Sequence, residues 1–72
     1  MTVGEAMRMA REKANYSRKE LSKLSGINAY NIGQYELDRN NPRIDVVELL
    51  ADALGISIDE YIGHEVKAGG KR

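Results

Sequence analysis

The sequence predicts an all-α fold of five short helices, and three observations support this prediction. A serine or threonine followed three residues later by glutamate occurs at Thr2, Ser17 and Ser57. This pattern starts helices because each of the two side chains accepts a hydrogen bond from the other residue's backbone N–H. Apolar residues then recur at helical spacing. Two of the segments end at Gly26 and Gly55, and glycine tolerates the left-handed backbone that terminates a helix.

The first helix is expected to run from Thr2 to about Asn15. Met7 and Ala10 lie on the face expected to turn inward, while Lys13 lies toward solvent. Asparagine is among the few residues other than glycine that adopt the left-handed conformation, so Asn15 is a suitable end for this helix.

The stretch from Ser17 to Glu36 is expected to form two short helices joined by a tight turn at Gly26. Leu21 and Leu24 give the first of them its helical spacing. Asn28 is the expected N-cap of the second, because its side chain can accept from the free N–H groups of the first turn. The chain should therefore hold the second helix at a steep angle to the first.

The second helix of this pair has a polar, uncharged outer face. An advance of about 100° per residue places Ile32 and Tyr35 inward and turns the polar side chains out, with Gly33 between them. Amide and hydroxyl groups can hydrogen-bond base edges in a DNA major groove, and a small apolar group can touch a thymine methyl. The candidate base contacts are Ala29, Tyr30, Asn31 and Gln34. The alternative is that they form the ordinary solvent face of a short helix.

Basic and amide side chains near this helix are candidates for phosphate contacts. They are Arg18, Lys19, Lys23, Arg39, Asn40 and Arg43, of which the last three lie in a loop from Leu37 to Arg43. Each alone is as compatible with an ordinary solvated charge. The net charge of zero argues against DNA binding, since phosphate neutralisation supplies much of the affinity. However, residues 1–43 hold eight basic and five acidic side chains, and residues 44–72 hold three and six.

A fourth helix is expected to start at Asp45 and end at Gly55. Its apolar arc spans about 200°, twice the roughly 100° typical of a helix on a small core. The second apolar stripe is interpreted as a dimer contact and consists of Val46, Leu49 and Ala53.

A fifth helix should begin at the Ser57 cap and end near Gly63. Tyr16, Tyr35 and Tyr61 are expected to be core aromatics with their hydroxyls at the surface. The domain is expected to comprise residues 1–63, with a flexible tail over 64–72 that has no apolar periodicity.

Length and composition exclude several classes of function. Seventy-two residues leave no room for a separate catalytic module, and no cysteine and a single histidine, His64, leave nothing for a metal site or an enzyme mechanism. No cofactor is therefore expected. Apolar runs are too short for a membrane span or a signal peptide, so a cytoplasmic location is expected.

The segment from Met7 to about Ile62 resembles the phage-repressor and Cro type helix-turn-helix family, often called XRE-like. The resemblance rests on MRMAREKANYSRKELSKLSGIN, on Ile32, Tyr35 and Glu36 in the second helix of the pair, and on the closing VVELLADALGISIDEYI. It implies a five-helix repressor-like DNA-binding domain in which the second helix of the pair is the recognition helix.

The resemblance also implies a partly buried ion pair between Arg11 and Glu36, the alternative being two solvated charges. The sequence departs from the family at three places. Arg18 replaces a glutamine that props the recognition helix, Ser22 replaces an alanine near the turn, and Leu37-Asp38 replaces Asn-Gly. The last difference leaves the shape of the following loop open.

The sequence thus predicts a DNA-binding transcriptional regulator, with a repressor favoured over an activator. It would bind double-stranded DNA as a homodimer through the helix Asn28–Glu36. The alternative keeps the fold and changes the partner: a protein-interaction module, such as an adaptor or the antitoxin of a toxin–antitoxin pair.

Overall fold

A computed structural model describes residues 1–62 of the chain and contains five helices there, with no strand in this range. The helices are α1 (Val3–Lys13), α2 (Arg18–Ser25), α3 (Ala29–Glu36), α4 (Ile44–Leu54) and α5 (Ile58–Ile62). The predicted all-α class is therefore confirmed. The expected domain boundary at residue 63, the tail over 64–72 and His64 lie outside the described residues.

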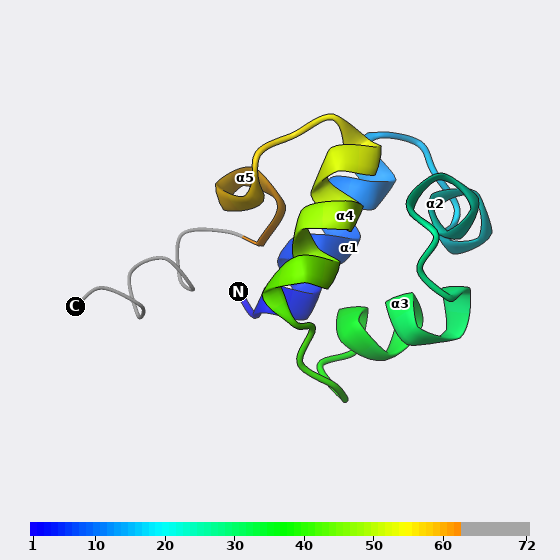
Figure 1. Ribbon diagram of the computed structural model, residues 1–72. Coiled ribbons are helices and arrows are strands. Elements are labelled where there is room, and N and C mark those ends of the chain that lie inside the picture. The colour runs from blue at the N-terminus through cyan, green and yellow to red at the C-terminus, as the bar shows by residue number, and fades with distance from the viewer. Residues whose placement is uncertain (63–72) are drawn as a thin grey trace.

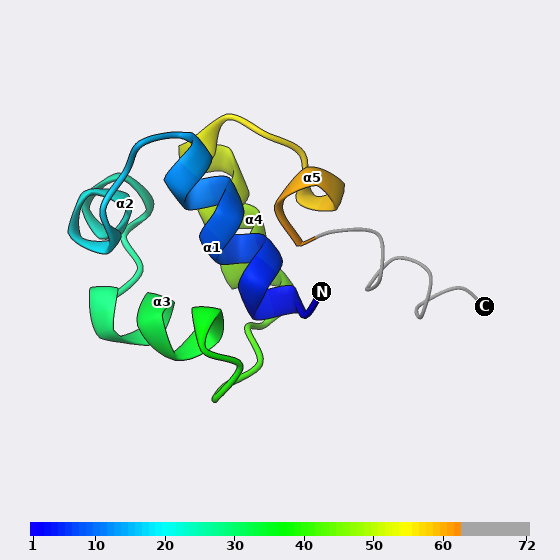
Figure 2. The ribbon, with the colours of Figure 1, turned by 180° about the vertical axis from the view of Figure 1, so that it is seen from behind.

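The helices α1 and α4 cross the middle of the molecule, one in front of the other, with α2 and α3 on one side and α5 on the other (Figure 1). Seen from behind, α1 lies in front of α4, with α2 and α3 now on the left and α5 on the right (Figure 2). The helix α3 contacts α1 and α2, while α5 contacts α1 and α4. This arrangement leaves the side of α3 opposite α1 open to a partner.

The capping patterns predicted from sequence form as expected. The Thr2 and Ser17 side chains each accept from the backbone N–H three residues later, and the glutamates there accept in return. Ser57 makes the same exchange with Glu60. The fourth helix differs slightly: it begins at Ile44, one residue before the expected start, and its N-cap Arg43 makes no side-chain capping hydrogen bond.

All five helices contribute to one hydrophobic core. Its buried members are Met7, Leu21, Ile32, Val47, Leu50, Ala51, Tyr61 and Ile62. Tyr16 and Tyr35 are half-buried, as expected for core aromatics near the surface. The expectation for Tyr61 was wrong, because its ring and hydroxyl are both fully buried and the hydroxyl has no hydrogen-bond partner within residues 1–62. Burial, with the nearby Glu36 carboxylate, raises the pKa of Tyr61, so the phenol stays neutral.

We expect Tyr61→Phe to raise the free energy of unfolding by about 1 kcal/mol. The ring packing is retained, and the substitution removes the cost of burying a hydroxyl without a partner. Thermal unfolding of the two chains measures the difference. A loss of stability would show that the hydroxyl makes a hydrogen bond in solution.

The start of α1 packs directly against the end of α3. Asp38 has a left-handed backbone with φ of 60° and follows α3 by two residues. Its carboxylate accepts from the backbone N–H of Gly4 at 2.9 Å and from the hydroxyl of Thr2 at 2.6 Å. A negative charge at a helix N-terminus is favourable because free N–H groups and the helix dipole both point to it. Asp38 therefore joins the end of α3 to the first turn of α1.

Gly4 allows this close approach. A Cβ atom at residue 4 would lie 2.5 Å from the carbonyl oxygen of Glu36 and 2.6 Å from that of Tyr35. Backbone atoms cannot move aside as a flexible side chain can, so α1 and α3 are in contact at a distance that only glycine permits. Among the residues described, no helix is long and apolar enough to cross a membrane.

Candidate nucleic-acid interface

The helices α2 and α3 are joined by a three-residue turn that begins at Gly26. Gly26 has φ of 80°, and its N–H donates to the carbonyl of Ser22. Asn28 then caps α3, with its side chain accepting from the N–H groups of Tyr30 and Asn31 at 2.8 and 3.3 Å. Both ends of the turn are thus fixed by local chemistry, and α3 leaves it as a short rigid helix.

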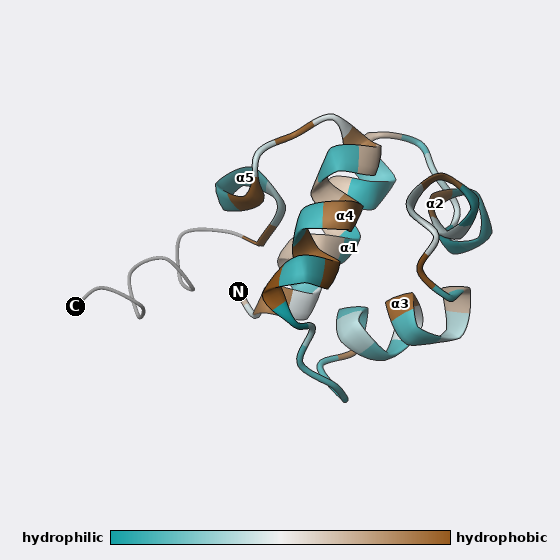
Figure 3. Cartoon of the chain, viewed as in Figure 1, coloured by the Kyte–Doolittle hydropathy of each residue, from teal (hydrophilic) through white to brown (hydrophobic). Residues whose placement is uncertain are grey.

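Two of the four predicted base-contact residues of α3 are exposed and two are half-buried. Tyr30 is 72% exposed and Asn31 is exposed, while Ala29 and Gln34 are half-buried. Figure 3 shows that α3 is hydrophilic over most of its length. The outward side of α3 therefore offers hydroxyl and amide groups to solvent.

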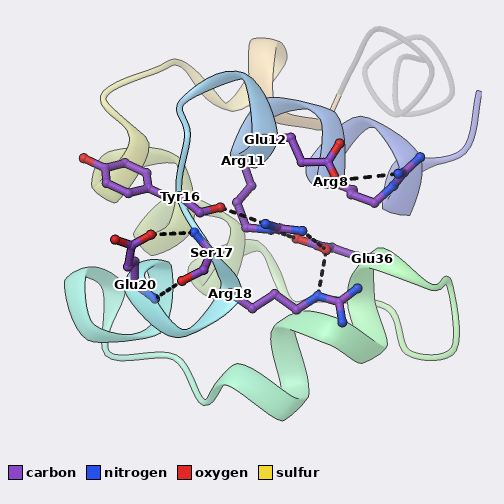
Figure 4. A network of polar contacts seen from close by, with 8 residues as sticks. All are labelled: Arg8, Arg11, Glu12, Tyr16, Ser17, Arg18, Glu20 and Glu36. Carbon is purple, nitrogen blue, oxygen red and sulfur yellow. Dashed lines mark hydrogen bonds and ion pairs between the residues drawn. The ribbon is translucent and has the colours of Figure 1, made fainter.

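Glu36, at the inner side of α3, lies between two arginines (Figure 4). Arg11 donates from Nε and Nη2 to the two carboxylate oxygens, at 2.7 and 3.0 Å, and from Nη1 to the carbonyl of Tyr16 at 2.7 Å. The Glu36 side chain is fully buried and that of Arg11 nearly so. The hydrogen bond to Glu36 raises the pKa of Arg11 and outweighs the opposite effect of burial. The ion pair implied by the resemblance is therefore present, and it ties α1 to the end of α3.

Arg18, the first residue of α2, makes the second contact to Glu36. Its Nε donates to a Glu36 carboxylate oxygen at 3.0 Å. Its guanidinium also lies over Gly33, where a Cβ atom would come within 3.3 Å of Nη1. Gly33 is consequently buried, whereas the sequence placed it on the open face. Arg18 thus braces α3 although it replaces the family's usual glutamine.

The other predicted phosphate contacts are exposed. Lys19 and Lys23 lie on α2, and the loop after α3 carries Arg39, Asn40 and Arg43. The N–H groups of Arg39 and Asn40 both donate to the carbonyl of Gln34, at 2.9 and 3.4 Å.

The backbone of the loop at residues 39 and 40 is therefore hydrogen-bonded to the last turn of α3. The Arg43 side chain is 85% exposed, and its Nε lies 3.6 Å from Oδ1 of Asp45 in a surface ion pair.

The apolar stripe on α4 is only partly exposed. Val46 and Ala53 are half-buried and pack against the core, while Leu49 is 48% exposed. Ile44, at the start of the same helix, is 62% exposed. Core packing accounts for part of the wide apolar arc, and Leu49 remains as its open member. No group of three potential metal ligands occurs within residues 1–62.

A model of the family described as "Helix-turn-helix" matches residues 7–61. The chain belongs to the helix-turn-helix family. This agrees with the phage-repressor and Cro type resemblance seen in the sequence, and it covers the whole α2–turn–α3 unit with its supporting helices. No solved structure matches this helix-turn-helix domain significantly.

Two curated relatives are similar to this helix-turn-helix domain. One is the "HTH-type transcriptional regulator ImmR" of Bacillus subtilis (strain 168), 31% identical over 65 residues, which are 90% of this chain and 51% of the relative. The other is the "Immunity repressor protein" of Bacillus phage phi105, 29% identical over 65 residues, 90% of this chain and 45% of the relative. The chain thus spans about half the length of these relatives.

Proposed function

We propose that the domain binds a specific double-stranded DNA sequence and regulates transcription, as a repressor, through α3. The observation that carries this proposal is the open polar side of α3, with Tyr30 72% exposed, on a helix braced from α1 and α2. A braced helix can present side chains to base edges at little cost in entropy. The names of the two relatives, a transcriptional regulator and a repressor, support the same conclusion.

In this proposal the outer face of α3 enters the major groove. Gln34 makes a bidentate contact to adenine, Asn31 and Tyr30 contact base edges or adjacent sugar, and Ala29 touches a thymine methyl. The phosphate contacts come from exposed groups on α2 and in the loop after α3, since such contacts position a helix without specifying sequence. They are Lys19, Lys23, Arg39, Asn40 and Arg43.

Selection of bound duplexes from a random pool tests the proposal. We expect the 72-residue chain to select a two-fold symmetric consensus, and Gln34→Ala to lose the preference for one base in each half-site. The loss at that base should be about 1–3 kcal/mol of discrimination. Unchanged selection by Gln34→Ala would reject the assigned contact, and selection of no consensus by the native chain would reject sequence-specific binding.

The dimer is part of the proposal, with Val46, Leu49 and Ala53 of α4 at the contact between copies. We expect Leu49→Glu to shift the chain to monomer in sedimentation and to weaken binding to the symmetric site. A buried carboxylate would have to be desolvated without a partner at the interface. The two half-sites should lie about 34 Å apart, one turn of DNA.

Met9→Glu is the matched control for Leu49→Glu. Met9 is on α1 and is 49% exposed, against 48% for Leu49, so the two substitutions introduce the same charge at equal exposure. Only the change on α4 should affect assembly. A native chain that sediments as a monomer on its selected DNA would contradict the dimer, and a native complex with an unrelated small protein would favour the antitoxin or adaptor alternative.

Proteins of this family generally regulate transcription without catalysing a reaction, and we propose the same for this chain. Its α3 surface is an array of hydroxyl and amide groups rather than a set of acids and bases converging on a cleft.

A further inference from the structure

Gly33 is buried because the Arg18 guanidinium of α2 covers this position of α3, which has no side chain. Around the helix axis it lies about 40° from Ala29 and about 60° from Tyr30, both proposed base contacts. A Cβ atom at residue 33 would lie 3.3 Å from Nη1 and 3.6 Å from Cζ of Arg18. The guanidinium of Arg18 therefore packs directly against α3 at the position where Gly33 has no side chain.

The Glu36 carboxylate fixes the Arg18 guanidinium in this place. The hydrogen bond runs from Nε at 3.0 Å, so the two terminal nitrogens are left for another partner. Figure 4 shows these nitrogens beyond Glu36, on the far side from Arg11. The Arg18 side chain is 41% exposed, whereas the Glu36 side chain is fully buried. The Nε side of the planar Arg18 guanidinium is thus held by Glu36, while its terminal nitrogens Nη1 and Nη2 can donate to another group.

We infer that Arg18 reads a guanine in the major groove and is not one of the phosphate contacts. This inference rests on the proposed function and adds a specificity-determining residue from α2. The terminal nitrogens of an arginine fit the O6 and N7 acceptors of guanine in a bidentate pair, the commonest specific contact in protein–DNA complexes. A guanidinium held by Glu36 loses little further freedom on binding, because its orientation is set before DNA arrives.

The test compares Arg18→Lys with the native chain. Lysine keeps the positive charge and can still serve a phosphate, but it cannot make the bidentate contact. We expect the native consensus to contain one guanine per half-site whose preference falls by about 10-fold to 100-fold in Arg18→Lys. Replacing that guanine with an analogue that lacks N7 should weaken binding by the native chain and have little effect on Arg18→Lys.

Gly33→Ala should disturb the proposed contact between Arg18 and guanine without changing the arginine itself. The new methyl group would lie 3.3 Å from Nη1, so the guanidinium must shift by a few tenths of an ångström and can keep its hydrogen bond to Glu36. Because alanine also favours the helix, the melting temperature should hold or rise. The preference for the same guanine should decrease. A lower guanine preference at an unchanged melting temperature would show that base recognition is lost while the domain stays folded.

Lys19→Gln is the control for a phosphate contact on the same helix. It should weaken binding to all sequences alike, lower the salt slope by about one and leave the consensus intact. If Arg18→Lys and Gly33→Ala leave a native consensus unchanged, the inference is wrong while the proposed function stands. If the native chain selects no consensus, both are wrong.

Discussion

Glu36→Ala is expected to lower the free energy of unfolding by about 3 kcal/mol or more. Within residues 1–62, the substitution leaves the buried guanidinium of Arg11 with its hydrogen bond to the Tyr16 carbonyl, and it removes the hydrogen bond between Arg18 and Glu36. Removing one partner of a buried ion pair is costly because the other charge stays desolvated. A core of this size supplies only about 3–5 kcal/mol of net stability. The variant should therefore be largely unfolded at room temperature by circular dichroism.

Glu12→Ala is the matched control, since it also removes one carboxylate from an arginine. The Arg8–Glu12 pair is separated by 3.7 Å and both side chains are about half exposed, so its loss should cost less than about 1 kcal/mol. At roughly 4–8 °C per kcal/mol for a domain of this length, thermal melts separate the two variants easily. Equal melting temperatures would show that the buried position of Glu36 contributes nothing.

Gly4→Ala is expected to destabilise the fold by about 3 kcal/mol, although alanine is the better helix former by ~1 kcal/mol. Its methyl group would lie 2.5 and 2.6 Å from two carbonyl oxygens of α3 and 2.7 Å from the Asp38 carboxylate. Because two of these three contacts are with backbone, α1 must move away from α3 as a unit. The hydrogen bonds of Asp38 would be lost with that movement.

The comparison for Gly4→Ala is Gly33→Ala, in which the methyl group meets only the flexible end of Arg18. Denaturant titration should show Gly33→Ala at or above the native stability and Gly4→Ala well below it. A stable Gly4→Ala chain would mean that α1 and α3 are farther apart in solution than in this structure.

Local patterns predicted most of the fold. Capping depends on residues three or four positions apart, so it can be read directly from the sequence. This applies to the helix N-termini capped by Thr2, Ser17 and Ser57 and to the helix C-terminus at Gly26. The exposure of Tyr30 likewise follows from helical periodicity alone. The Arg11–Glu36 pair, in contrast, was expected only from the family resemblance.

The interactions that position the site could not be predicted from the sequence. Asp38 binds Gly4 across 34 residues, and Arg18 reaches Glu36 across 18. No local pattern encodes which charged group meets which helix end, because that depends on how α1 and α2 pack against α3. The prediction that the Tyr61 hydroxyl lies at the surface was wrong for a related reason. Helical periodicity predicts burial of the ring, but it does not predict whether the hydroxyl reaches solvent or a hydrogen-bond partner. The one available signal was the glycine inside a helix, at Gly4 and at Gly33, where it marks a close neighbour.

The contact between Asp38 and the first turn has a consequence for truncation. The segment shared with the family begins at residue 7, yet Thr2 and Gly4 hold the far end of α3 through Asp38. A polypeptide started at Met7 would retain every residue proposed to face DNA but would lose the hydrogen bonds that join the first turn of α1 to the end of α3. We therefore expect a polypeptide that starts at residue 7, where the family match begins, to be less stable than one that starts at residue 1.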